Sequence, residues 1–102
     1  MIRHIVLFKL SDELSTSEKH EQINTIKKRF EPLSEEIEGL VCLRVEININ
    51  PKEEFDFALI ADLEGEEYIE KYAQHPAHKG LVAELIAPHL AKRACVDYVF
   101  RE

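Results

Sequence analysis

The sequence lacks any long apolar run. The apolar segment at residues 5–8 is four residues long and ends at Lys9, whereas a membrane-spanning helix needs about 18 or more apolar residues. The same segment is too short for the apolar core of a secretory signal. We therefore expect no membrane association and a cytoplasmic location, where thiols stay reduced.

Basic residues are also scarce. The 102-residue chain has 13 Lys and Arg against 20 Asp and Glu, which gives a formal net charge of −7. Because phosphate backbones are bound by clustered Lys and Arg, this balance argues against nucleic acid as a partner. The densest basic group, Lys27 to Arg29, would splay around a helix instead of forming a stripe, which is typical of a solvated surface.

Cysteine is nearly absent. The only two, Cys42 and Cys95, have no CxxC or HxxC partner. Zinc sites ordinarily show such spacings, so the sequence predicts no metal and no cofactor. Both cysteines are expected to be small core or half-buried side chains.

A clear order of strands separated by helices is present. Period-2 alternation and β-branched residues predict strands at residues 2–10, 41–49, 55–63 and 93–101. A short helix is expected at residues 66–73, and another begins at Pro76 and ends or bends at Pro88.

The first helix has its own start and stop signals. Ser15 and Glu18 fit a capping box that opens it. Pro32 lies inside the apolar stripe that follows and is expected to kink or end the helix. Gly39 then supplies the stop.

This order of elements is that of the split βαβ, or ferredoxin-like, arrangement. It predicts one α+β domain over residues 1–102, with a four-stranded antiparallel sheet in the order 4-1-3-2. The second and fourth strands then form opposite edges about 14 Å apart. At that distance Cys42 and Cys95 cannot form a disulfide.

Helices on one side of such a sheet leave the other side bare. The apolar residues that we assign to the bare side are Val6, Phe8, Phe55, Phe57, Leu59 and Tyr98. A bare apolar sheet is an interaction surface. We expect a second copy of the chain to cover it, so that two sheets close a homodimeric α+β barrel with His4 facing its interior.

Two groups of residues could carry chemistry. His4 on an apolar strand face needs a partner for its ring nitrogens, and it is either a satisfied core histidine or a general acid or base lining a cavity. His78 falls in the first turn of the helix that begins at Pro76, whose positive end disfavours imidazolium. A neutral His78 could accept a proton while Tyr72 donates to a developing oxyanion. Alternatively, the segment is a structural joint, with His75 as its cap and Tyr72 in the core.

Three segments together carry a family resemblance. Residues 2–9 (IRHIVLFK), residues 72–78 (YAQHPAH) and residues 97–98 (DY) resemble the stress-responsive dimeric α/β-barrel (Dabb) family in order and spacing. The resemblance spans essentially the whole chain. It implies a ferredoxin-like fold and a homodimeric barrel.

The resemblance also implies a pocket. A plant polyketide cyclase of this family closes a linear polyketide by aldol condensation, and its histidine base and substrate-holding tyrosine match His78 and Tyr72. A pocket histidine of its first strand matches His4. Where the cyclase has another pocket histidine this chain has Phe57, whose apolar ring fills space and departs from the cyclase pattern. We assign His4, Phe57 and His75 to substrate binding, of which the resemblance itself supports His4.

Three functions stay open on the sequence. The favoured one is a homodimer that binds a small apolar or carbonyl-containing ligand between sheet and helices, with its activity unassigned, as for many family members. The second is a cyclase-like lyase with His78 as general base. The third is a non-catalytic, stress-protective dimer in which the same side chains are structural.

Overall fold

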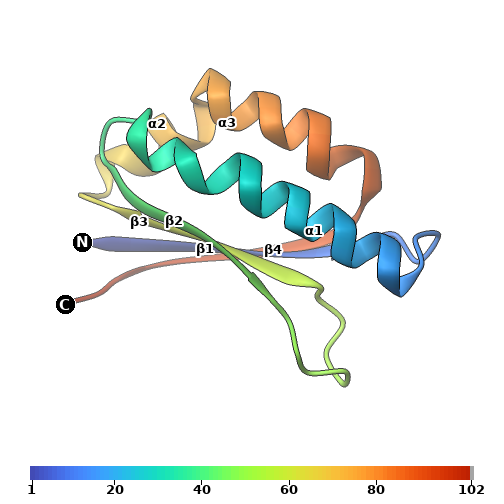
Figure 1. Cartoon of the computed structure of the whole chain (residues 1–102). Coiled ribbons are helices and arrows are strands. Elements are labelled where there is room, and N and C mark those ends of the chain that lie inside the picture. Colours follow the sequence, from blue (N-terminus) through green and yellow to red (C-terminus); the bar gives the residue numbers. More distant parts are fainter. Residues whose placement is uncertain (102) are drawn as a thin grey trace.

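The structure, a computed structural model, describes residues 1–101. Its strands β1 (Ile2–Leu10), β2 (Leu40–Ile47), β3 (Phe57–Leu63) and β4 (Leu90–Val99) form one antiparallel sheet in the order β2-β3-β1-β4. The main helices α1 (Thr16–Phe30), α2 (Glu67–Gln74) and α3 (Pro76–Leu81) all lie on one side of this sheet (Figure 1). The predicted ferredoxin-like α+β fold and strand order are confirmed.

Helix α1 begins as the sequence predicts. The Glu18 backbone N–H donates to the Ser15 hydroxyl at 3.1 Å, and the Ser15 N–H donates to the Glu18 carboxylate at 2.8 Å. This reciprocal capping box satisfies two donors that a helix start leaves unpaired. After Phe30 the chain tightens into the 3₁₀ helix η1 (Glu31–Glu35), which accommodates Pro32.

The second helical region is broken into short pieces. Helix α3 continues into a π-helical turn, η2 (Val82–Ile86), and then into the 3₁₀ turn η3 (Ala87–His89), which contains Pro88. Pro88 thus ends the helical segment as predicted. Within residues 1–101, no helix combines the length and the apolar character needed to cross a membrane.

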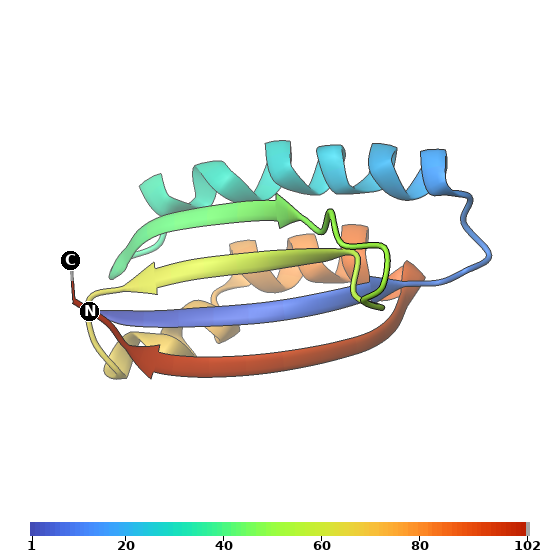
Figure 2. The same ribbon diagram turned by 90° about the horizontal axis from the view of Figure 1, so that it is seen from below.

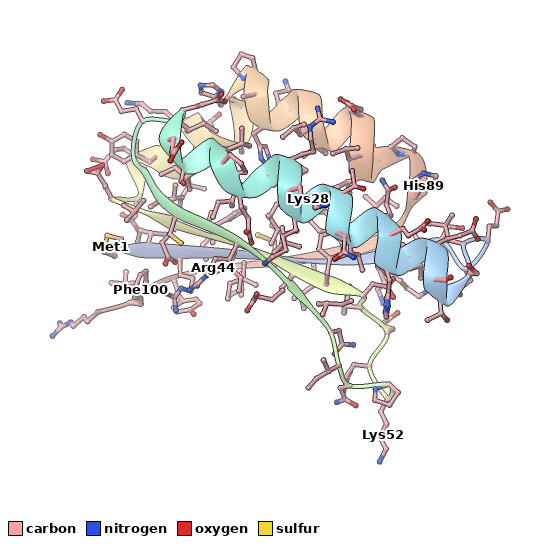
Figure 3. The ribbon with its side chains drawn as sticks, in the orientation of Figure 1. Met1, Lys28, Arg44, Lys52, His89 and Phe100 are labelled. Atoms are coloured by element: carbon pink, nitrogen blue, oxygen red, sulfur yellow. The ribbon has the colours of Figure 1, made fainter. Side chains whose placement is uncertain are left out.

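The hairpin between β2 and β3 is longer than predicted. The strands were expected to extend to residue 49 and to begin again at residue 55, but β2 ends at Ile47 and β3 begins at Phe57. The Asn48 side chain donates to the backbone carbonyls of Asn50 and Phe55. These side-chain bonds replace strand pairing in the loop, and Lys52 lies at its tip (Figure 3).

The core lies between the sheet and the helices. The helix-facing residues of the two central strands include Val6, Phe8 and Leu10 of β1 and Phe57, Leu59 and Leu63 of β3, and all six are buried. They pack against Ile26 and Phe30 of α1 and Ile86 of η2, which are also fully buried. The side of the sheet away from the helices has no element over it in the described chain (Figure 2).

The predicted assignment of the two sheet faces was wrong for the residues of β1 and β3 and right for Tyr98, which lies opposite Arg3 on the bare side. Val6, Phe8, Phe57 and Leu59 lie under the helices and not on the bare side. The residues on the bare side, which we name the open face, are Arg3, Ile5, Leu7, Cys42, Arg44, Glu46, Ala58, Ile60, Asp62, Ala94, Val96 and Tyr98. Alternation shows which residues share a face, but both faces of β1 are apolar, so it could not show which one the helices cover.

Strand β2 was misassigned for a different reason. Val41 was placed on the same face as Leu43 and Val45, yet Val41 is 51% exposed while the other two are buried. The pairing with β3 shifts register between Leu40 and Cys42. Such an irregularity inserts an extra residue and moves side chains before it to the other face.

The open face has a charged end. The Arg3 guanidinium donates to both carboxylate oxygens of Asp62 at 2.7 and 3.1 Å, and Arg44 lies 3.9 Å from the same carboxylate. Arg3 also lies over the Phe100 ring at 4.0 Å, and Phe100 lies on the side of the sheet away from the helices (Figure 3). The rest of the open face is mainly apolar.

Gly39 is a position where only glycine fits. Its φ is 84°, and a Cβ built there would lie 2.1 Å from the Tyr68 ring. We expect Gly39→Ala to lower the free energy of unfolding by more than about 1 kcal/mol, because it adds backbone strain to a clash. Urea denaturation measures this change.

Gly80 is the matched control. It lies within α3, and a Cβ there would meet nothing within 4 Å. Gly80→Ala should therefore raise the free energy of unfolding by about 0.5–1 kcal/mol, since alanine is the better helix former. Equal effects of the two substitutions would contradict the special role of Gly39.

Candidate functional site

Three elements bring the predicted side chains together. His4 comes from the helix-facing side of β1, Tyr72 from the last turns of α2, and His78 from the first turn of α3. The ring centroids of Tyr72 and His78 are 4.4 Å apart, and those of His4 and Tyr72 are 5.9 Å apart. We call these three residues the histidine–tyrosine cluster.

The break between α2 and α3 places His78. His75 has extended backbone angles, φ −60° and ψ 131°, as expected for a residue before proline. Its Nδ1 accepts a hydrogen bond from the Ala77 N–H at 3.1 Å and so caps α3. With Pro76 as the first helical residue, the half-buried His78 is the third residue of α3, and its ring centroid lies 6.0 Å from that of Phe30.

His75 therefore acts first as a helix cap in this structure. Its Nδ1 is occupied by the Ala77 N–H, which leaves only the other ring nitrogen for a ligand. Its proposed part in substrate binding stays a prediction.

Two polar atoms of the cluster are buried without partners. The Tyr72 hydroxyl and the His78 Nδ1 have no hydrogen-bond partner among the residues that the structure describes. Tyr72 is 1% exposed. Leaving a buried polar group unpaired costs about 1–3 kcal/mol, so such atoms in native proteins call for an explanation.

Burial sets the protonation of the cluster. Burial, together with smaller contributions from the nearby imidazoles of His4 and His75, lowers the pKa of His78 to about 4. Burial also raises the pKa of the Tyr72 hydroxyl. Near neutral pH a neutral His78 imidazole thus lies beside a protonated phenol. In the tautomer with its proton on Nε2, the His78 Nδ1 is an acceptor and the Tyr72 hydroxyl a donor.

His4 has a partner that sequence reasoning missed. Strand β4 pairs with β1 so that Asp97 lies opposite His4 and Cys95 lies opposite Val6. The His4 Nδ1 donates to the Asp97 carboxylate, and the Cys95 Sγ lies 3.6 Å from the same nitrogen. The expectation that His4 faces the interior of a dimer barrel was wrong, because its side of β1 faces the helices.

Cys95 is not an activated nucleophile in this arrangement. Burial and the neighbouring Asp97 carboxylate raise the pKa of its thiol. Nucleophilic cysteines need the opposite shift, since the thiolate is the reactive form. Cys42 lies on the far edge strand β2, and both cysteines are free.

Phe57 fills core space beside Phe8, away from the position on β3 that lies opposite His4. Its ring packs on Phe8 at 5.2 Å between centroids and is almost fully buried. In the pairing of β1 with β3, Phe57 lies opposite Phe8, whereas Ala61 lies opposite His4. Its proposed contact with a ligand stays a prediction.

The surface has four hollows of about 240 to 420 Å³. One of about 300 Å³ lies between the start of α1 and the β2–β3 hairpin. None of these four, found over residues 1–101, is lined by His4, Tyr72 or His78. None of these four hollows therefore gives a ligand a path to the cluster.

Comparison with known proteins identifies the family. Residues 2–100 match the Stress responsive A/B Barrel Domain (Dabb). The chain belongs to this family.

Individual relatives agree with this assignment. An uncharacterized protein of Streptomyces coelicolor is 33% identical over 101 residues, which cover 98% of this chain and 100% of that protein. A crystal structure of a dimeric ferredoxin-like protein of unknown function from Bacteroides fragilis is 35% identical, with a TM-score of 0.87 and coverage of 97% of this chain and 95% of the other. A dimeric ferredoxin-like protein of unknown function from Thermobifida fusca is 33% identical, with a TM-score of 0.77 and coverage of 97% and 90%.

The low pKa of His78 makes the stability of this A/B barrel domain depend on pH. The unfolded chain binds a proton on His78 near its ordinary pKa of 6.5, whereas the folded chain does so only near 4. The unfolded state thus holds more protons between these values, and the free energy of unfolding should fall as pH drops from about 6.5 to 4. His78→Gln should remove this part of the slope in melting temperature against pH.

The matched control is His20→Gln, at an exposed position on α1. His20→Gln should keep the wild-type slope of melting temperature against pH. If the melting temperatures of wild type and His78→Gln change in parallel between pH 4 and 6.5, His78 does not have the lowered pKa given above.

Proposed function

We propose that this protein is a homodimer in which each chain binds a small carbonyl-containing compound at the histidine–tyrosine cluster. The observation that carries this proposal is the adjacent unpartnered pair, the Tyr72 hydroxyl and the His78 Nδ1, both buried within the described chain. A carbonyl oxygen accepts from the Tyr72 hydroxyl. An acidic C–H or an O–H beside that carbonyl faces the His78 acceptor, so one ligand satisfies both atoms.

The surroundings restrict the ligand. The cluster is embedded in apolar side chains, with Phe30 beside His78 and Val6 next to His4 on the same face of β1. Such sites bind ligands mainly through apolar contact and orient them with a few polar groups. A small β-keto or aromatic carbonyl compound fits this description, and a highly charged ligand does not.

The neutral state of His78 favours a second function, base catalysis. His78 would take a proton from the carbon next to the carbonyl, the C–H electron pair would form the enolate double bond, and Tyr72 would donate to the enolate oxygen. A pKa near 4 makes a weak base. The negative charge of the enolate would favour the imidazolium and raise that pKa as the proton moves.

The dimer is supported by the open face and by the relatives. Ile5, Leu7 and Ile60 lie on this face together with Val96, which is 55% exposed. Contiguous apolar surface of this kind is normally covered in soluble proteins. The Bacteroides fragilis and Thermobifida fusca proteins, at 35% and 33% identity, are both described as dimeric.

Thermal shift with small β-keto and aromatic carbonyl compounds tests the ligand site. A compound that binds only the folded state raises the melting temperature. We expect stabilising compounds whose effect is lost in Tyr72→Phe and His78→Gln and kept in the surface control His20→Gln. Compounds that stabilise would then be assayed for exchange of their α-hydrogens in deuterated water.

Two outcomes contradict parts of this proposal. If no compound shifts wild type, or if the shift persists in both cluster variants, the chain is better described as a non-catalytic dimer. Binding without α-hydrogen exchange would support the ligand site and contradict the proposed base catalysis.

Light scattering tests the dimer separately. Wild type should have about twice the chain mass of 11.8 kDa. Val96→Glu places a charge on the open face and should shift the mass toward one chain, because burying an unpaired carboxylate is costly. The control Ala83→Glu adds the same charge at an exposed position of η2 and should leave the dimer intact; a dimeric Val96→Glu would place the interface elsewhere.

A further inference from the structure

Strand β4 differs from the other strands because its helix-facing side is not covered. Every residue from 91 to 99 is exposed, and β4 forms one edge of the sheet (Figure 2). The helix-facing side of β4 carries Cys95 and Asp97. Asp97 is paired with His4 of β1, and Cys95 is paired with Val6. Three different types of metal-ligating side chain thus meet at a solvent-accessible edge.

The sheet register places their donor atoms close together. Asp97 lies directly opposite His4, and Cys95 lies two residues earlier on the same face. The His4 nitrogen, the Cys95 sulfur and an Asp97 oxygen all lie within 4.8 Å of one another. The paired strands hold the backbone of all three, so little ordering is needed to bring them together.

Both neighbours converge on one nitrogen. Asp97 accepts from the His4 Nδ1, and the Cys95 Sγ lies 3.6 Å from the same atom. A ring nitrogen that carries one proton can serve only one of these partners fully. A cation at the centre of the three would instead accept a lone pair from each.

We propose that His4, Cys95 and Asp97 form a binding site for Zn²⁺ or a similar transition-metal ion. Imidazole nitrogen, thiolate sulfur and carboxylate oxygen are the ligands that zinc uses. A thiolate in the set disfavours Mg²⁺ and Ca²⁺, which take oxygen ligands. Bond lengths of 2.0–2.3 Å in a tetrahedral site put donor atoms about 3.3–3.8 Å apart, and the 3.6 Å between His4 and Cys95 fits that range. The Asp97 oxygen is bonded directly to the His4 Nδ1, so the exposed Asp97 side chain must move away from that nitrogen to admit an ion.

Binding changes the proton content of the site. His4 binds through Nδ1 in the tautomer that carries its proton on Nε2, so the Nδ1 proton is lost to solvent and Nε2 takes one up. The Cys95 thiol releases its proton to the buffer as it becomes a thiolate. Three protein ligands leave the fourth tetrahedral position to solvent, the arrangement of zinc sites that keep an open position. Because the His4 ring lies 5.9 Å from the Tyr72 ring, the ion would border the histidine–tyrosine cluster.

The sequence did not indicate this site, and the expectation of no metal was based on the missing CxxC and HxxC spacings. The ligands are too far apart in sequence for such a motif, since Cys95 and His4 are separated by 91 residues. Only strand pairing brings them together. The site goes beyond the ligand proposal for Tyr72 and His78 and does not depend on it.

Cobalt titration of the Cys42→Ser protein tests the site, because Cys95 is then the only thiol. We expect one Co²⁺ per chain with a thiolate-to-metal charge-transfer absorption band, displaced by Zn²⁺ and not by Mg²⁺. Zn²⁺ should also protect Cys95 from reaction with a disulfide reagent such as DTNB. In the same background, Cys95→Ser should abolish the band.

Asp97→Asn provides the second variant, at an exposed position that should not affect folding. It should weaken Co²⁺ binding by at least the roughly 10- to 100-fold that losing a supporting residue of a metal site typically costs. His20→Asn, on the distant exposed face of α1, should not change it. Absence of the band in the Cys42→Ser protein, or unchanged affinity in Asp97→Asn, would overturn the proposal.

Discussion

Strand β1 pairs with β3 on one side and with β4 on the other, and the register of these two ladders decides which side chains meet on each face. On the helix-facing side the register puts His4 beside Ala61 and Asp97. Ala61 is fully buried, and the His4 ring packs edge-on against the Tyr72 ring. Arg3, which precedes His4 in the chain, points to the open face and is held there by its hydrogen bonds to Asp62. A shift of β1 by one residue would exchange the two sets, so the site and the open face share one constraint.

The cluster is maintained against an energetic cost. The Tyr72 hydroxyl and the His78 Nδ1 are buried without partners in the described chain, at about 1–3 kcal/mol each. Domains of this kind have net stabilities of only about 5–15 kcal/mol. The contacts of the surrounding core and the His75 cap must therefore offset this cost and hold the two rings in place. A purely structural role would be served as well by Phe at position 72, which would bury no hydroxyl, and this argues for a ligand as the missing partner.

Much of the fold could be predicted from local sequence signals. The capping box at Ser15, the strand alternation and the break at Pro76 each act over a few residues, and the structure shows all three. The face assignment failed because Ile5 and Leu7 make the second face of β1 apolar as well. A fully buried strand and one whose open face awaits a partner have the same alternation.

The site was predictable only in part, for a related reason. His78 and Tyr72 lie six residues apart around a proline joint, so local reasoning brings them together. Cys95 and Asp97 reach His4 only through the pairing of the first and last strands. Their i and i+2 spacing on one strand face is a signal, but it becomes specific only once the register with β1 is known. Contacts between distant segments depend on topology, and no local pattern carries that information.

Alternation along β1 also links the proposed functions. Arg3 and Ile5 belong to the open face and flank His4 in sequence. A second copy packed on that face would restrain the backbone on both sides of His4, while the ligand-binding side stays free under the helices. The same copy would leave the helix-facing side of β4 accessible, since a β-strand presents its two faces in opposite directions. Dimer contact thus uses one face of the sheet, and the two proposed binding sites use the other, where they share His4. Any coupling between ligand binding and metal binding would pass through that residue.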